Sequence, residues 1–153
     1  MFDMFHNYDT HTLTRDLAAA PETVFAAFSD DKARAIWTGP SEDLNMSMSH
    51  ADFSAGGRDQ SICGPGPAEG VVVDTHYHAI TPPSAILSTE ILRMGPDIAC
   101  ISLVTIQITA KGDGSQISVT LQSTTPDDPA NITEVQQGWQ AALENLAQYL
   151  ANS

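Results

Sequence analysis

The sequence predicts an α+β domain in which a curved antiparallel sheet of about seven strands wraps around one long C-terminal helix. Three observations lead to this prediction. Residues 131–150 repeat apolar side chains at helical spacing, residues 44–122 alternate strand and turn signals, and two short helical stretches separate the first two strands. A sheet curled around a helix forms an incomplete barrel, whose interior is filled with side chains or holds a cavity.

The chain begins with a tail and one strand. Residues 1–8 are expected to form an N-terminal tail, followed by a single domain over residues 9–153. Residues 9–17 are rich in threonine, which predicts the first strand.

Two short helices are expected next. Pro21 favours a first helical turn, and the acidic residue after it complements the helix dipole. One face of this helix carries Val24, Phe25 and Phe28. A second helix is expected from Asp30 or Asp31 to Trp37, because the Gly-Pro pair at residues 39–40 stops it.

Six strands separated by glycine and proline turns should complete the sheet. They are expected at residues 47–53, 58–63, 70–80, 85–94, 98–110 and 116–123. The last strand alternates Ile117, Val119 and Leu121 with polar residues, as in an antiparallel sheet with one covered face. The last two strands flank a Gly-Asp-Gly turn and predict a hairpin.

The final helix is expected over residues 131–150. Asn131 is a favourable N-cap, and Glu134 three residues later suggests a capping box. The apolar stripe comprises Ile132, Val135, Trp139, Ala142, Leu143, Leu146 and Leu150. Gly138 is unfavourable within a helix, so we expect the helix backbone to approach the sheet closely there.

Composition narrows the function classes. The 153 residues are 42% hydrophobic and 16% charged, which is typical of a globular domain rather than a disordered chain. The formal charge of -13 disfavours binding to nucleic acids or anionic membranes, since both repel an acidic protein. Cys63 and Cys100 lack the paired spacing of a zinc or redox motif, so we expect free thiols in a cytoplasmic protein.

Several short motifs together resemble a known superfamily. They are residues 20–25 (Ala-Pro-Glu-x-Val-Phe), 37–40 (Trp-Thr-Gly-Pro), 52–58 (Asp-Phe-x-x-Gly-Gly-Arg), 77–82 (Tyr-His-x-Ile-x-Pro), Glu90, 102–105 (Ser-Leu-Val-Thr) and the region around Gly138 and Trp139. In this order and spacing they resemble the SRPBCC/START-like helix-grip superfamily, within it the branch of activator-of-Hsp90-ATPase-homologue-like domains. The resemblance implies the helix-grip fold. The chain departs from it after Leu121, where many relatives carry an acidic and aromatic segment.

Polar residues on one strand were weighed as metal ligands. Asp74, His76 and His78 share one strand face, because side chains alternate with period two. Such a row could bind a metal with His50 or Asp52, but polar residues on a solvated strand face, or a histidine hydrogen-bonded under the helix, are the simpler and favoured explanation. We therefore expect no metal and no cofactor.

Glu90 is the most unusual polar residue, because it lies in an otherwise apolar strand with Ser88 on the same face. Pointing into a cavity, it would be a desolvated carboxylate with a raised pKa, suited to acid–base chemistry or to holding a polar ligand group. The simpler interpretation, which we favour, pairs Glu90 with Arg58, Arg93 or a histidine. Arg58 follows a double glycine that permits a sharp bend in the sheet.

Three functional hypotheses follow. The leading one is binding of a small, mostly hydrophobic molecule between the sheet and the last helix. The others are a cyclase, dehydratase or hydrolase that uses His78 and Glu90 as an acid–base pair, and a co-chaperone-like module or homodimer. The residues expected at the ligand site are Phe25, Phe28, Trp37, Phe53, Arg58, His78, Glu90, Ser102, Trp139 and Leu143.

Overall fold

In the described part of the chain, a seven-stranded sheet and three helices make up the fold. The computed structural model describes residues 7–38, 46–63 and 70–152. The elements in chain order are β1 (Tyr8–Leu17), α1 (Pro21–Ser29), α2 (Asp31–Trp37), β2 (Met46–His50), β3 (Arg58–Cys63), β4 (Val71–Thr81), β5 (Ala85–Met94), β6 (Asp97–Lys111), β7 (Gly114–Thr124) and α3 (Ala130–Ala151). The expected α+β class and element order are confirmed. Residues 1–6 of the expected tail lie outside the described residues, and Tyr8 already belongs to β1.

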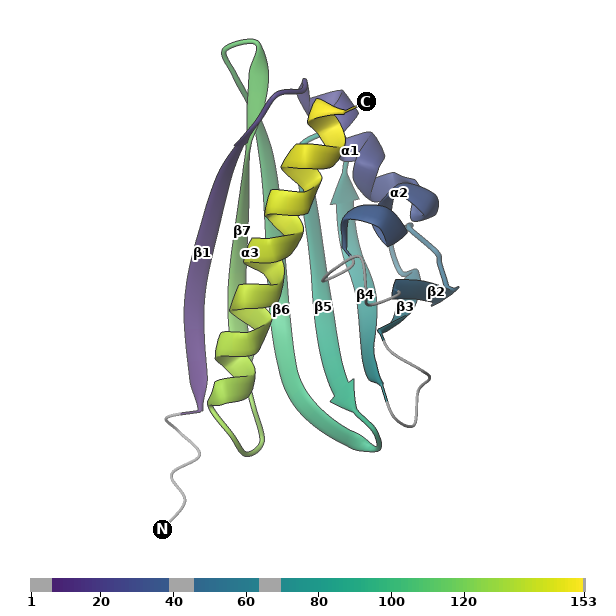
Figure 1. Cartoon of the computed structure of the whole chain (residues 1–153), viewed down its shortest axis with the longest axis vertical. Coiled ribbons are helices and arrows are strands. Elements are labelled where there is room, and N and C mark those ends of the chain that lie inside the picture. The colour runs from purple at the N-terminus through teal and green to yellow at the C-terminus, as the bar shows by residue number, and fades with distance from the viewer. Residues whose placement is uncertain (1–6, 39–45, 64–69, 153) are drawn as a thin grey trace.

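The sheet is antiparallel throughout and is not closed into a barrel. Its strand order is β1-β7-β6-β5-β4-β3-β2, so β1 and β2 form its two edges. Helices α1 and α2 carry the chain from one edge to the other, and α3 runs diagonally across the concave face (Figure 1). This arrangement is the helix-grip fold that the motif pattern predicted.

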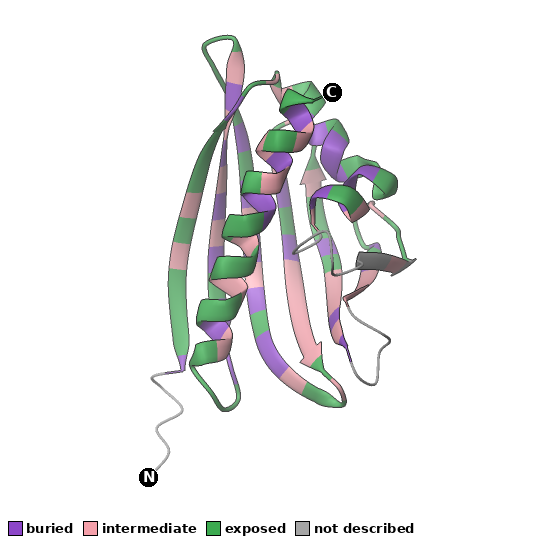
Figure 2. Ribbon diagram, in the orientation of Figure 1, coloured by how far each residue is buried: buried purple, intermediate pink, exposed green. Residues whose placement is uncertain are grey.

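The apolar stripe of α3 packs against this sheet. Ile132, Ala142, Leu143, Leu146 and Leu150 are buried, while the opposite side of the helix is exposed (Figure 2). Beneath them the alternation in β7 leaves Ile117, Val119 and Leu121 fully buried. Each large side chain buried in this way contributes roughly 1.5–3 kcal/mol, so the β7 side of the interface holds α3 in place.

The start of α3 differs from the expectation. The helix begins at Ala130, Pro129 occupies the N-cap position, and no side chain caps it. A turn ahead of the helix supplies the first partners, since the Asp128 carboxylate accepts the N–H of Ala130 at 3.0 Å and its carbonyl accepts the N–H of Asn131. The predicted capping box of Asn131 and Glu134 is therefore wrong, because this turn places both residues inside the helix.

The second strand is shorter than expected. It ends at His50 rather than residue 53, with an irregular register just before its end. The chain then turns tightly, with Gly56 at a φ of 84° and Gly57 so close to Asp52 that a Cβ would lie 2.3 Å from its carbonyl oxygen. The Asp59 carboxylate closes the turn by accepting the Asp52 N–H at 2.8 Å. The bend expected at the double glycine is thus present, and it releases Phe53 from the strand.

The two short helices have the expected signals. Pro21 opens α1, with Glu22 in its first turn. Asp30 caps α2, because its side chain accepts the N–H of Lys32 at 2.9 Å. Among the described residues, no helix combines the length and apolar composition that a membrane span requires.

Candidate functional site

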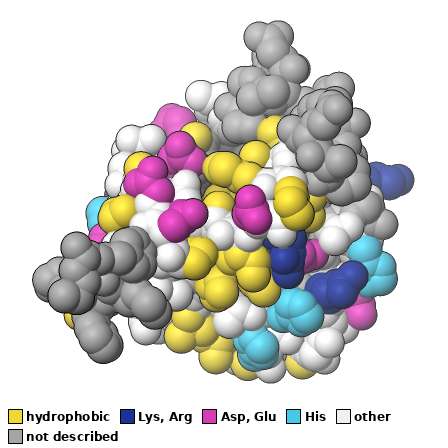
Figure 3. All heavy atoms as spheres, turned by 90° about the horizontal axis from the view of Figure 1, so that it is seen from below, with side chains coloured by type: hydrophobic (Ala, Val, Ile, Leu, Met, Phe, Trp, Pro, Cys, Tyr) yellow, Lys and Arg dark blue, Asp and Glu magenta, His cyan; other side chains and the backbone are white. Residues whose placement is uncertain are grey.

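A cavity of about 430 Å³ lies between the sheet and α3, away from the tightly packed β7 side. Strands β3, β4 and β5 form one wall, and residues 134–142 of α3 form the other. Helices α1 and α2 bound one end through Phe28, Arg34 and Trp37, while Val71, Met94 and Glu134 lie toward the opposite end. Seen from below, hydrophobic side chains gather near the middle of this opposite end with acidic side chains among them (Figure 3).

Strand alternation explains which side chains enter the cavity. In β5 every second residue lines it, from Ile86 through Ser88, Glu90 and Leu92 to Met94. The neighbouring strands contribute in the same way, and the inward residues of β3 and β4 are Asp59, Ser61, Cys63, Val71, Val73, Thr75 and Tyr77. The expected common face of Ser88 and Glu90 is therefore confirmed. Most of the lining is apolar, with polar groups at a few positions only.

Glu90 is held by the helix opposite. The indole Nε1 of Trp139 donates to its Oε1 at 3.2 Å, which joins α3 to the middle of β5. Burial among apolar side chains raises the pKa of Glu90 to about 7, although the hydrogen bond from Trp139 acts to lower it. The favoured pairing of Glu90 with a basic residue is wrong within the described residues, since Arg93 instead pairs with Asp74 at 3.1 Å.

A buried polar cluster forms the end of the cavity near α1 and α2. Arg34 Nη2 lies 2.9 Å from Asp59 Oδ2, and both side chains are more than nine-tenths buried. Arg34 Nη1 also donates to the carbonyl of Phe28 at 2.5 Å, and the Tyr77 hydroxyl donates to Asp59. Within the described part of the chain, Nη2 makes this ion pair but no hydrogen bond. Nη2 is shielded from solvent, so the guanidinium group is held inside the cluster by Asp59 and Phe28.

The Tyr77 hydroxyl in this cluster stays protonated. Burial raises its pKa, and the Asp59 carboxylate that it faces adds to the effect, against the opposing charge of Arg34. Tyr77 therefore acts as a fixed donor to Asp59.

Four of the ten predicted site residues line the cavity: Phe28, Trp37, Glu90 and Trp139. Trp37 is fixed in place, since its Nε1 donates to the carbonyl of Ala27 at 3.0 Å and its ring meets Phe28 edge-on at 4.9 Å. The aromatic signals at these positions thus correspond to cavity walls as well as to core.

Three of the predicted wall residues belong to the core instead. Phe25 and Leu143 are buried in the main hydrophobic cluster. The Phe53 ring packs edge-on against Phe25 at 5.7 Å and against Tyr77 at 4.8 Å. They support the walls from behind rather than line the cavity.

Ser102 lies on the strand next to Glu90 and directly opposite it in register. It is only 2% exposed and shares a 2.8 Å hydrogen bond with Ser123, so it does not line the cavity.

Arg58 and His78 lie outside the cavity, and both are exposed. The register of β4 shifts between Tyr77 and Ala79, and His78 shares a hydrogen bond with Thr89 at 3.0 Å. Thr89 lies between two inward residues of β5 and so faces away from the cavity. The structure therefore does not assemble the His78–Glu90 acid–base pair. Within the described residues, no three His, Cys, Asp or Glu side chains gather as a metal-binding group.

The prediction missed the polar cluster of Arg34, Asp59 and Tyr77. Two signals could have found it. Arg34 stands three residues before Trp37 on a helix, so the two share a face. Asp59 and Tyr77 are the chain neighbours of the predicted residues Arg58 and His78. Because side chains alternate along a strand, Asp59 and Tyr77 point into the cavity while Arg58 and His78 point away from it.

Gly138 also differs from the expectation. A Cβ built on it would meet nothing within 4 Å, and the residue lines the cavity. The helix backbone therefore does not touch the sheet there, because the cavity separates them. The missing side chain leaves this space open beside Trp139.

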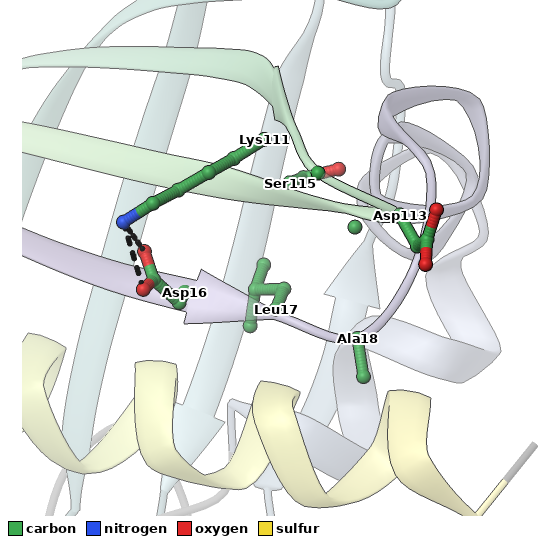
Figure 4. Close-up of a pocket in the computed structure, with 8 residues that line it drawn as sticks. Asp16, Leu17, Ala18, Lys111, Asp113 and Ser115 are labelled. Carbon is green, nitrogen blue, oxygen red and sulfur yellow. Dashed lines mark hydrogen bonds and ion pairs between the residues drawn. The ribbon is translucent and has the colours of Figure 1, made fainter.

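A second depression lies at the β6–β7 turn, beside the end of β1 (Figure 4). Two of its three charged side chains pair, since Lys111 Nζ reaches Asp16 Oδ2 at 2.9 Å, and Asp113 is the third. Lys111 and Asp16 are more than half exposed, so their ion pair is a surface pair of little energetic value. The cavity beneath α3 is the better candidate.

Cys63 and Cys100 are both free thiols, as expected. Cys63 lines the cavity, while Cys100 is buried in the core.

The comparisons with known proteins agree with this geometry. The family described as "Activator of Hsp90 ATPase homolog 1-like protein" matches residues 18–151. No curated protein sequence matches the chain.

Solved bacterial structures share the whole fold. A protein from Rhizobium leguminosarum is 25% identical, with a TM-score of 0.85 over 95% of this chain and 96% of the other. Mll3558 from Rhizobium loti is 29% identical, with a TM-score of 0.80 over 94% and 97%. CV1439 from Chromobacterium violaceum is 27% identical, with a TM-score of 0.76 over 93% and 97%.

Proposed function

The chain belongs to the family of activator-of-Hsp90-ATPase-homologue-like proteins, and we propose that it binds a small, mostly apolar molecule in the cavity beneath α3. The observation that carries the proposal is the cavity itself. Its volume of about 430 Å³ falls within the range of small-molecule sites. A fold with a filled interior would offer no such space.

The chemistry of the lining supports the same proposal. Small-molecule sites combine apolar walls with a few polar groups that fix orientation. Here Val73, Leu92 and Trp139 supply apolar surface, while Glu90 and Ser88 supply polar groups. An elongated molecule could therefore lie between the sheet and α3 with polar atoms at defined positions.

A thermal-shift screen of hydrophobic metabolites tests the proposal. A ligand that binds only the folded state raises the melting temperature in a saturable way. Gly138→Leu should abolish this stabilisation, because Gly138 lines the cavity and a Cβ there meets nothing within 4 Å, so the longer side chain would occupy space that the ligand needs. Gln137→Leu is the matched control, since it adds the same side chain one residue away on the exposed surface.

Trp139→Ala should also lose binding, but truncation of a buried aromatic residue costs roughly 3–5 kcal/mol of stability. It is therefore informative only when the variant is folded. The proposal would be contradicted by ligands that stabilise Gly138→Leu as strongly as the wild type. It would be contradicted equally by a screen in which no hydrophobic compound gives saturable stabilisation.

We also propose a cytoplasmic location, which the two free thiols support, since cysteines in oxidising compartments are usually paired.

A further inference from the structure

The charged groups of the cavity are unbalanced. Arg34 and Asp59 neutralise each other across 2.9 Å at one end. The other charged side chains among the described lining residues are Glu90 and Glu134, and both are acidic. The space available to a ligand therefore has an excess of negative charge.

Glu90 is the residue most affected by this imbalance. Its partner in the described structure is the neutral indole of Trp139, which contributes one hydrogen bond at 3.2 Å. Ser88 and Leu92 flank it on the same face of β5, and Ile86 lies beyond Ser88. An ionised carboxylate in such surroundings carries a large desolvation cost, which a bound cation would offset.

The charge of the whole chain acts in the same direction. With six lysines and arginines against nineteen aspartates and glutamates, the molecule attracts cations and repels anions. Such a field favours the approach of a positively charged ligand and disfavours a fatty-acid-like carboxylate.

We propose that the ligand is an apolar molecule bearing one protonated amine, which ion-pairs with the Glu90 carboxylate. Its apolar body packs against Val73, Leu92 and Trp139 along the cavity. This inference rests on the proposed function and adds the chemical class of the ligand.

An anionic ligand has a weaker basis in the same cavity. Arg34 is the one basic side chain among the described lining residues, and its charge is already committed to Asp59.

The proposed pairing has a pH signature. Glu90 ionises near pH 7, whereas an alkylamine stays protonated to about pH 10, as lysine does. As the pH is raised toward 7, the affinity for the amine should therefore increase roughly tenfold per pH unit, and above pH 7 it should level off. Among the described residues, the other titratable or charged groups that line the same cavity are Glu134 of α3, Arg34 of α2, Asp59 and Cys63 of β3 and Tyr77 of β4, and Cys100 of β6 also interacts electrostatically with Glu90.

The test uses three compounds that share one phenylbutyl body: 4-phenylbutylamine, 4-phenylbutan-1-ol and 5-phenylpentanoate. Isothermal titration of the full chain at pH 8 should give an amine affinity at least tenfold above that of the alcohol, with the carboxylate weakest. Glu90→Gln should remove the advantage of the amine, because glutamine still accepts from Trp139 but carries no charge. Glu144→Gln is the matched control, since it removes one negative charge from the exposed side of α3.

Each outcome bears on a different claim. Equal affinities for amine and alcohol would overturn the amine inference and leave the proposed function standing, as would a carboxylate that binds best. No binding by any of the three compounds would count against both. The pH profile of amine binding to the wild type provides a readout independent of the variants: an affinity that is flat between pH 5.5 and pH 7.5 would overturn the pairing with Glu90.

Discussion

Glu90 shows how strongly one residue depends on its place in the fold. A carboxylate on the outer face of β5 would be solvated and ionised at neutral pH. Because side chains alternate between the two faces of a strand, Glu90 lies instead on the inner face of β5, between Ser88 and Leu92 on the cavity wall and under Trp139. Its pKa of about 7 follows from that position.

This residue should make stability depend on pH. In the unfolded chain Glu90 ionises near its ordinary pKa of 4.5, whereas in the folded protein it ionises near 7. The folded state therefore binds the proton more tightly and loses relative stability as the pH rises from about 4.5 to 7. Glu90→Gln removes this loss, so the variant should be more stable than the wild type above pH 7, by roughly 3 kcal/mol at most.

Urea unfolding at pH 5, 6, 7 and 8 measures the difference. It should be small at pH 5, grow up to about pH 7 and change little between pH 7 and pH 8. Glu144→Gln should differ from the wild type by a nearly constant amount, because that carboxylate is exposed and pairs with Arg15 on the surface. A Glu90→Gln difference that does not change with pH would show that the carboxyl is not desolvated.

Helix α3 combines two roles at the scale of a secondary-structure element. Its second half packs against the core through Leu143, Leu146 and Leu150. Its first half bounds the cavity through Val135, Gly138 and Trp139. One continuous apolar stripe therefore packs against the core at one end of the helix and bounds the cavity at the other end.

Gly138 provides a test of this division. Glycine within a helix is about 1 kcal/mol less favourable than alanine, and the space around Gly138 is open. Gly138→Ala should thus raise the free energy of unfolding by roughly 0.5–1 kcal/mol.

Gly112 of the β6–β7 turn is the matched control, because its φ of 57° is unfavourable for other residues. Gly112→Ala should lower the free energy of unfolding by about 1 kcal/mol in the same urea experiment. If Gly138→Ala destabilised the protein instead, the open space beside the helix would be in doubt.

The elements could be predicted from the sequence because their signals are local. The alternation in β5 and in β7, the helical stripe of α3 and the N-cap of α2 are each formed by residues that are close together in the sequence. The start of α3 could not be predicted in this way, since the Asp128 turn competed successfully with the Asn131 capping signal.

The site was harder to predict because it depends on how distant elements meet. Arg34 and Asp59 are far apart in the sequence, and only the packing of α2 against β3 brings their charges together. Likewise, the irregular register of β4 after Tyr77 decides which of two neighbouring residues enters the cavity. Gly138 stands out in the sequence as a glycine within a helix, but the sequence does not show whether the sheet beneath it is close or distant. In the structure a Cβ there would meet nothing within 4 Å.

At the scale of the whole molecule, α3 does not fill all the space on the concave side of the curved sheet. The β1 and β7 side packs closely under the helix, while the β3 to β5 side leaves the cavity open. The charge of -13 surrounds this cavity with a negative field. Shape and charge together favour a small apolar cation over a large or anionic partner.

The alternative of a homodimer or co-chaperone-like module stays a prediction. The largest exposed apolar side chains among the described residues lie on different elements, with Tyr8 on β1, Ile36 on α2, Leu87 and Met94 on β5 and Ile101 on β6. Light scattering and a pull-down would detect such an association.

The central claim, that the cavity beneath α3 takes up a small apolar molecule, is tested most directly by an NMR titration with 4-phenylbutan-1-ol. We expect the indole N–H signal of Trp139 to shift saturably, together with the backbone amide signals of β5 from Ile86 to Met94, because these residues border the cavity. The amide of Val119, on the packed side of the sheet, should remain in place. Saturable shifts confined to other surfaces, or an unchanged Trp139 signal at the solubility limit of the alcohol, would contradict the account.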